Sequence, residues 1–363
     1  MVKLKLKSQI IVSVLLLIII SVLSISIGFS KSSYLKNQIS YNSVLNKDVE
    51  VDVVVTWVDS GNSLFILERD RYISGKNNSI RLPESKNTFI EINECVRLIF
   101  KNLKFIRNLI VVTCRPQTLP NAVFSQMSNT QRKKIRVIHH DQFIPKKYLP
   151  TFNSNCIEMF IHLLPGLSEN FIYMNDDFYI LKKRKLNDFF VTSKKNNSII
   201  PRYNCMKKNF MLNSLKYRLI QEITMLPFIN NTHTYCLLKN IYEYMNMSNS
   251  INMYEITHAP VPLTKTIMDS MFAKHIYGFD KIWDKCRFRC KDDYMPILIT
   301  LHNSIMFGDA VLETKNKLKT CEVEKISQKN ITHKLQYDFL SINSLDIESE
   351  TEIQDFFKLL NQY

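Results

Sequence analysis

The sequence lacks the common signatures of nucleic-acid-binding proteins, although its formal net charge is +15. It has no zinc-finger spacing, no aromatic RNA-binding signature and no basic region followed by heptads. Its positive residues form short, separate clusters, such as 132–134 and 182–185. Basic surface that meets phosphate-bearing substrates explains this charge, and so does a biased genome composition. Nucleic acid is therefore not an expected partner.

Glycine is also scarce, at 6 of 363 residues, and the chain has no internal repeat or long low-complexity tract. A repeat architecture is thus excluded. The 45% hydrophobic and 22% charged residues are typical of a folded globular protein. Among the eight cysteines, Cys286 and Cys290 have no second ligand pair nearby, which argues against structural zinc.

The first 30 residues contain the longest apolar run. Lys3, Lys5 and Lys7 precede an uncharged stretch over 8–30, long enough for a membrane-spanning helix. The basic flank predicts a type II signal anchor with the bulk of the chain lumenal (Golgi or ER) or extracytoplasmic. A cleaved signal peptide is the alternative. Sequons agree with a lumenal glycoprotein; they lie at Asn77, Asn196, Asn230, Asn246 and Asn330.

We predict three parts: a cytoplasmic tail and anchor at 1–30, a stem at 31–50 and a catalytic domain at 51–363, with an insertion or cap at about 185–250. In the catalytic domain, apolar runs alternate with helical periodicity. Strands are expected at 51–58, 109–113, 135–138 and 171–174, with helices at 90–100, 121–131 and 155–164. This alternation predicts an α/β fold, Rossmann-like (GT-A-like), with a mostly parallel sheet and flanking helices in addition to the transmembrane helix.

Polar residues follow each predicted strand. Ligands bind at the carboxyl ends of parallel strands, so these residues are expected to converge on one crevice. Each alone could be an ordinary turn residue. The four groups are Asp59 to Asn62, Arg115 with Pro116, His139 to Asp141, and Asn175 to Asp177.

Three segments could carry chemistry. Asp176 and Asp177 directly follow a buried strand, and such paired carboxylates suit a divalent cation, with Mg²⁺ expected and Mn²⁺ or Ca²⁺ as alternatives. His258 precedes two prolines that fix the backbone of its segment; it could carry a proton, or could simply be a packed loop histidine. Arg289 could contact phosphate oxygens, or could be an exposed arginine beside a core Phe.

Together these segments resemble the Stealth family. The residues that carry the resemblance are Asp52 to Asp59, Glu91 with Arg97, 110–113, 149–154 with Glu158, 162–177, 258–263 and 337–343. They run in order along about 51–360. The family includes bacterial capsule polymerases and the catalytic core of the animal N-acetylglucosamine-1-phosphotransferase.

The resemblance implies transfer of hexose-1-phosphate, with N-acetylglucosamine-1-phosphate expected, from a UDP-sugar to a glycan or polysaccharide hydroxyl, with release of UMP and help from a divalent cation. Asp176 and Asp177 would bind the cation or deprotonate the acceptor. His258 would transfer a proton or contact phosphate, and Arg289 would offset phosphate charge. Substrate contacts are expected at Asp59, Arg97, Asn153, Asn175 and Asn343.

One position departs from the family pattern. Many members have Asn-Asp where this chain has Asn343-Ser344. The lost carboxylate leaves an inactive, glycan-binding homologue as one alternative. A nucleotide-sugar glycosyltransferase that releases UDP is another, because only the leaving group separates the two reactions. The sequence is also compatible with a homo-oligomer.

Overall fold

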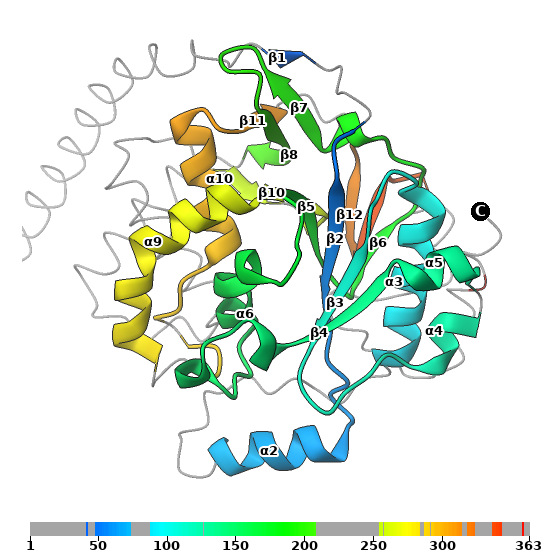
Figure 1. The fold of residues 1–363 in the computed structure, drawn as a ribbon, viewed down its shortest axis with the longest axis vertical. Helices are drawn as coiled ribbons and strands as arrows, with labels where there is room; N and C mark the ends of the chain where they lie inside the picture. The colour runs from blue at the N-terminus through cyan, green and yellow to red at the C-terminus, as the bar shows by residue number, and fades with distance from the viewer. Residues whose placement is uncertain are drawn as a thin grey trace, which may run out of the picture. The chain divides into compact units, whose positions relative to one another are not determined.

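The computed structural model describes part of the chain, and the elements below belong to that part (Figure 1). The chain divides into two compact units, Met1–Ser40 and Tyr41–Tyr363, and all described residues lie in the second. The described residues are 41–42, 48–73, 88–125, 127–207, 254–256, 258–283, 287–290, 292–313, 318–323, 336–342 and 358.

A five-stranded sheet forms the centre of this unit, in the order β10-β5-β2-β3-β4. Four strands are parallel, and β10 pairs antiparallel with β5 at the edge. The sequence predictions for the four parallel strands are confirmed, since β-branched and other apolar residues fill them as expected of strands covered on both faces. The bounds are β2 Val51–Thr56, β3 Leu109–Thr113, β4 Ile135–His139, β5 Asn170–Asn175 and β10 Val261–Thr264.

Helices cover both faces of the central sheet (Figure 1). Alternate side chains of β2 point to opposite faces, so Val53 and Val55 join one core and Val54 joins the other. The first core includes α3 (Thr88–Asn102) and α4 (Asn121–Ser125). The second core includes α6 (Ser154–Phe160), α9 (Lys265–Ile282) and α10 (Pro296–Phe307). Two shorter or more peripheral helices are α2 (Ser63–Ile73) and α5 (Asn129–Lys133).

Two further sheets correct the expectation of a single, mostly parallel sheet. One contains β1, β7, β8, β9 and β11, and the other has the order β12-β13-β6. All three sheets mix parallel and antiparallel pairs. The strands are β1 Tyr41–Asn42, β6 Phe178–Ile180, β7 Phe190–Ser193, β8 Ile199–Lys207, β9 Tyr254–Ile256, β11 Val311–Glu313, β12 Thr320–Val323 and β13 Phe339–Ile342. The expected insertion at 185–250 thus begins with β7 and β8, and 208–253 lies outside the described residues.

The predictions of a transmembrane helix and of a single-pass, lumenally oriented protein are also corrected. Within the described ranges, no helix is both long enough and apolar enough to span a bilayer. α9 has 18 residues but carries charges such as Lys265 and Asp269, and apolar α10 has 12, whereas a span needs about 20 apolar residues. The predicted anchor at 1–30 itself falls outside the described residues.

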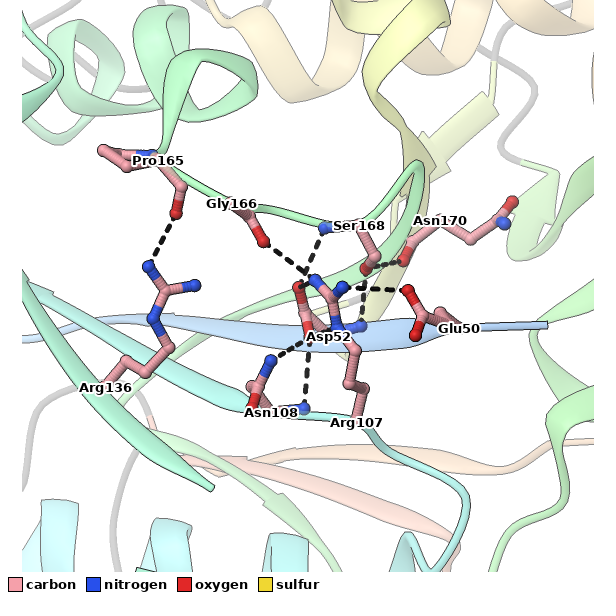
Figure 2. Close-up of polar contacts among 9 residues, drawn as sticks. All are labelled: Glu50, Asp52, Arg107, Asn108, Arg136, Pro165, Gly166, Ser168 and Asn170. Atoms are coloured by element: carbon pink, nitrogen blue, oxygen red, sulfur yellow. Dashed lines mark hydrogen bonds and ion pairs between the residues drawn. The ribbon is translucent and has the colours of Figure 1, made fainter. Parts of the chain in front are cut away.

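At the start of the central strands, a buried carboxylate ties three chain segments together (Figure 2). Asp52 is fully buried and accepts hydrogen bonds from Arg107 Nε (2.9 Å) and from the backbone N–H groups of Asn108 (3.1 Å) and Ser168 (2.8 Å). Arg107 also donates to the Gly166 carbonyl (2.8 Å). Burial alone would raise the pKa of Asp52, but the hydrogen bonds and the Arg107 charge lower it below its usual value. We call these residues the Asp52 cluster.

Candidate active site

The acidic turn, Asp176 and Asp177, lies where the chain leaves the central sheet. It directly follows β5 and directly precedes β6, which belongs to a different sheet. The Asp177 carbonyl accepts a hydrogen bond from the Ile342 N–H (3.2 Å), so β13 holds the turn from the second side. The turn is therefore fixed at the junction of two sheets, and both aspartates are half-buried.

The charges of this turn reach into the core. Burial raises the pKa of the Cys95 thiol on α3 well above its usual value, and the charges of Asp176 and Asp177 raise it further. The pKa of Tyr179 is also raised, by burial and then by Glu91, Cys95 and the two aspartates. Neutral Cys95 and Tyr179 thus lie close to a concentration of negative charge. Such a concentration favours a bound cation.

His258 comes from a distant stretch of chain and lies beside the turn. β10 runs antiparallel to β5 with Val261 opposite Tyr173, so the residues before β10 return toward the end of β5. The imidazole stacks on Phe178, the residue after Asp177, with ring centroids 6.0 Å apart and an angle of 23° between the rings. The two segments expected to meet in the site are therefore adjacent.

A second polar group surrounds Tyr173, which is almost fully buried on β5. Its hydroxyl lies 2.9 Å from Asn175 Oδ1, 3.1 Å from Glu158 Oε1 and 3.2 Å from the Thr56 hydroxyl. The Thr56 hydroxyl also lies 3.5 Å from Asn175 Oδ1. We call these four residues the Tyr173 network; it joins the ends of β2 and β5 to α6.

Counting protons in this network indicates the state of Glu158. The hydroxyls of Thr56 and Tyr173 carry one proton each, so on their own they can make hydrogen bonds of only two of the four contacts. A proton on Glu158 supplies a third donor. Consistently, burial raises the pKa of Glu158 to about 7, against the lowering effects of the Arg289 charge and the Tyr173 hydroxyl.

Arg289 is held beside this network. Its Nε (3.2 Å) and Nη2 (2.5 Å) donate to the Ser154 hydroxyl. The following residue, Cys290, is disulfide-bonded, and its N–H donates to Asp293 Oδ2 (3.2 Å). Burial raises the pKa of Asp293 to about 6, although hydrogen bonds from Asn153 and others lower it. Arg289 is half-buried, and the hydrogen bond between Cys290 and Asp293 helps to fix its loop.

Asn153, a predicted substrate contact, lies at the start of α6. It is fully buried at the N-cap of α6, where its Oδ1 accepts from the Asn155 N–H (3.0 Å). Its Nδ2 donates to Asp293 Oδ2 (2.8 Å). Asn153 therefore supports the loop that carries Arg289, and its contact with substrate stays a prediction.

Asp59 lies at the end of β2, next to the end of β3. Gln117 links the two ends, since its Oε1 accepts from the Asp59 N–H (2.8 Å) and its Nε2 donates to the Asp59 carbonyl (2.9 Å). The Gln117 carbonyl also lies 2.9 Å from His139 Nε2 at the end of β4. The predicted convergence of strand-end residues is thus visible across β2, β3 and β4.

Two further predicted substrate contacts, Arg97 and Asn343, remain predictions. Arg97 on α3 pairs with Glu94 (2.7 Å), and its Nη2 has no hydrogen-bond partner among the described residues. Asn343 and Ser344 lie outside the described residues, so the departure from the family pattern stays untested.

The acidic turn suits a hard cation. In the described part of the chain, no group of three or more His, Cys, Asp or Glu side chains could hold a metal ion. Mg²⁺, however, is commonly held by one or two carboxylates, with substrate phosphates and water completing its shell. Asp176 and Asp177 offer two oxygen ligands in a region of negative charge. This donor set fits a cation that binds together with a diphosphate.

Sequence reasoning gave no role to Glu158, Tyr173, Thr56 or Asp293. Glu158 was part of the resemblance, and a carboxylate in a short helix just after the Asn153 cap was a usable signal. Tyr173 lies in an apolar strand, and Asp293 lies in an irregular segment, so neither carried a sequence signal for its partners.

Comparison with known proteins finds a family match over part of the chain. Residues 87–198 match conserved region 2 of the Stealth proteins. This match supports the resemblance to the Stealth family. The match includes α3, α6, the acidic turn and Glu158, but it does not extend to His258 or Arg289.

Bacterial capsular polysaccharide phosphotransferases are among the relatives that this chain is similar to. A capsular polysaccharide phosphotransferase of Streptococcus thermophilus, eps5J, is 34% identical over 150 residues, covering 40% of this chain and 59% of the relative. Another, cps1A of Actinobacillus pleuropneumoniae, is 28% identical over 258 residues, covering 67% of this chain and 65% of the relative. The chain thus spans less than two thirds of the length of these relatives.

Among solved structures, galactosyltransferase LgtC with donor and acceptor sugar analogues is similar with a TM-score of 0.36 and 9% identity. The similarity covers 86% of this chain and 95% of that one.

Proposed function

We propose that this protein is a phosphotransferase that moves hexose-1-phosphate from a UDP-sugar to a hydroxyl of a glycan, with release of UMP. The proposal is supported by the names of the similar relatives, which are capsular polysaccharide phosphotransferases. The observation that carries it is the meeting of the acidic turn and His258 beside a guanidinium-bearing loop at the carboxyl ends of β2 and β5.

In this reaction the acceptor oxygen attacks the β-phosphorus of the donor, and the bond from that phosphorus to the bridging oxygen breaks as UMP leaves. The acceptor hydroxyl loses its proton, and His258, which stacks on the residue after Asp177, is our candidate for receiving it. Arg289 offsets negative charge on the phosphoryl oxygens. A cation held by Asp176 and Asp177 would, when bound, neutralise charge on the diphosphate.

Glu158 acts as a positioning residue in this proposal. Protonated, it completes the hydrogen bonds of Tyr173 and thereby fixes Asn175, the residue before the acidic turn. An uncharged Glu158 also leaves the positive charge of Arg289 available to phosphate instead of pairing it with a carboxylate. N-acetylglucosamine is the expected sugar and Mg²⁺ the expected cation.

The leaving group provides the test. The purified chain is incubated with a panel of UDP-sugars, a divalent cation and glycan acceptors, and the released nucleotide is identified. UMP supports phosphotransfer, whereas UDP supports glycosyl transfer. Donor binding without turnover under all conditions supports the inactive homologue.

The Asp177→Ala variant tests the site. Loss of a cation ligand is expected to lower turnover by about a thousandfold or more, because the diphosphate charge is no longer offset. Asp70→Ala is the matched control, since Asp70 is an exposed carboxylate that pairs with its neighbour Arg69 on α2. Equal turnover in the Asp177→Ala variant and the wild type would remove the site assignment.

A further inference from the structure

A pocket of about 540 Å³ lies at the opposite end of β5 from the acidic turn. Asn170, the first residue of β5, and Thr264, the last residue of β10, are paired in the sheet and both line it. β5 has six residues, so about 17 Å of strand separates this end from Asn175. The pocket is therefore distinct from the candidate active site. Its volume is within the range of about 300–1,000 Å³ that is usual for small-molecule sites.

Two carboxamides in the lining have unused hydrogen-bonding capacity. Asn170 Oδ1 and Asn303 Nδ2 have no hydrogen-bond partner among the described residues, and the two side chains belong to residues only 8% and 7% exposed. Figure 2 shows that the backbone carbonyl of Asn170 is held by Ser168, while its side chain points away from the Asp52 cluster. A buried amide atom without a partner costs about 1–3 kcal/mol, which a polar ligand would recover.

The rest of the lining combines small hydroxyls and amides with apolar surface. Ser270 and Ser304 contribute hydroxyls, and Ile267, Met271 and Phe307 contribute apolar area. Phe307 is 54% exposed, and Lys274 Nζ lies 4.2 Å from its ring centroid. A sugar needs this combination, because its hydroxyls require paired donors and acceptors and its C–H faces pack against apolar side chains.

The charges of the lining argue against the other common ligands. Its two carboxylates, Glu169 and Asp309, outnumber its one ammonium group, Lys274. Phosphate and nucleotide sites rely on guanidinium or ammonium clusters, so they do not fit. A lipid chain does not fit either, since it would leave the Asn and Ser side chains without partners.

We infer that this pocket is a second saccharide-binding site, which holds sugar units of the acceptor that do not react. The inference deepens the proposed function and rests on its glycan acceptor. Because the pocket lies so far from the acidic turn, only an acceptor of several sugar units can occupy both places at once. Binding in the pocket would lower KM for oligosaccharide and polysaccharide acceptors relative to single sugars, without changing the chemical step.

Direct binding tests the inference independently of turnover. Saturation-transfer NMR is recorded on the full chain with neutral oligosaccharides of glucose, galactose, mannose or N-acetylglucosamine, in the presence and absence of excess UDP. Saturable binding that UDP does not displace is expected. Ser270→Trp places an indole in the pocket from an exposed position on α9 and should weaken binding by about tenfold or more. Ala273→Trp is the control, because Ala273 is exposed on the same helix but outside the lining.

A second variant separates a ligand role from a structural one. Asn303→Leu should weaken binding while leaving the melting temperature unchanged or raised, since it removes a buried amide atom that lacks a partner. In the transfer assay, Ser270→Trp should raise KM for long acceptors about tenfold and leave kcat and short acceptors unchanged.

Absence of binding by every oligosaccharide, or equal binding by Ser270→Trp and wild type, would overturn the pocket assignment even if UMP is released. Binding without any nucleotide release would instead retain the saccharide site and overturn the proposed transfer reaction.

Discussion

At the two ends of the central sheet, the pKa values of buried carboxyl groups shift in opposite directions. In the Asp52 cluster, Asp52 is fully buried but receives hydrogen bonds from a guanidinium and two backbone N–H groups, and its pKa is lowered. In the Tyr173 network, Glu158 contacts the Tyr173 hydroxyl and receives no hydrogen bond from a cationic side chain among the described residues, and burial raises its pKa to about 7. Burial disfavours the charged form of both carboxyl groups. Hydrogen bonds and the Arg107 charge offset this effect at Asp52, whereas it is largely uncompensated at Glu158.

This difference indicates that the Asp52 cluster serves the stability of the sheet and that the Tyr173 network serves the candidate active site. The Asp52 cluster joins the starts of β2, β3 and β5 through one charged group, so it stabilises the sheet. Burial raises the pKa values of Glu158 and Asp293, which costs stability near neutral pH. Within the described ranges, Arg289 forms no ion pair with a carboxylate, and its guanidinium donates to the Ser154 hydroxyl. Perturbed pKa values are frequent at functional sites, and the raised pKa values of Glu158 and Asp293 both belong to groups near Arg289.

Removing the Asp52 carboxylate should have the largest effect on stability. Asp52→Ala leaves the Arg107 guanidinium and two buried N–H groups without their acceptor, so the free energy of unfolding should fall by about 3–5 kcal/mol. Urea unfolding measures this fall, and Asp70→Ala on the surface of α2 is the control, with an expected change within about 0.5 kcal/mol. A loss as small as that of the control would show that the cluster does not hold the sheet.

The Glu158→Gln variant tests the other side of the comparison. A carboxyl group with a raised pKa stabilises the fold below its unfolded value, near 4.5, and that contribution is lost as the pH rises through about 7. Glutamine can donate to Tyr173 at every pH. The wild type should therefore lose on the order of 2 kcal/mol relative to the variant between about pH 5 and pH 8, a value reduced for the partial exposure of Glu158.

Urea unfolding of both proteins across this pH range measures the difference, so that contributions from other groups cancel. Parallel stability curves for the two proteins would mean that Glu158 is ionised throughout, and would refute the proton count in the Tyr173 network.

Much of the central sheet could be predicted from the sequence, because its strands are buried on both faces and read as continuous apolar runs. β2 and β3 are examples. The second and third sheets could not, since their strands pair across long separations: Phe178 of β6 lies opposite Ser341 of β13. The periodicity of apolar residues within a segment predicts a strand but not the distant strand with which it pairs.

The site shows the same limit. Asp176, Asp177 and His258 were identified from local features, and the antiparallel pairing of β10 with β5 brings them together. Glu158 and Asp293 depend on neighbours far along the chain, Tyr173 and Asn153, whose hydrogen bonds appear only in the folded protein.

A pair of serine variants gives the smallest and sharpest test. Ser168 Oγ accepts from the Asp52 N–H (2.9 Å) and donates to the Asn170 carbonyl (2.6 Å), so Ser168→Ala should cost about 1 kcal/mol of stability and leave kcat unchanged. Ser154 Oγ instead holds the half-buried Arg289. Ser154→Ala should cost less stability but raise KM for the donor about threefold to tenfold, because the guanidinium is no longer fixed. Urea midpoints and steady-state kinetics on both variants measure the two effects. If both serines changed stability alone, the opposite ends of the sheet would have the same role, and Arg289 would not contact the donor.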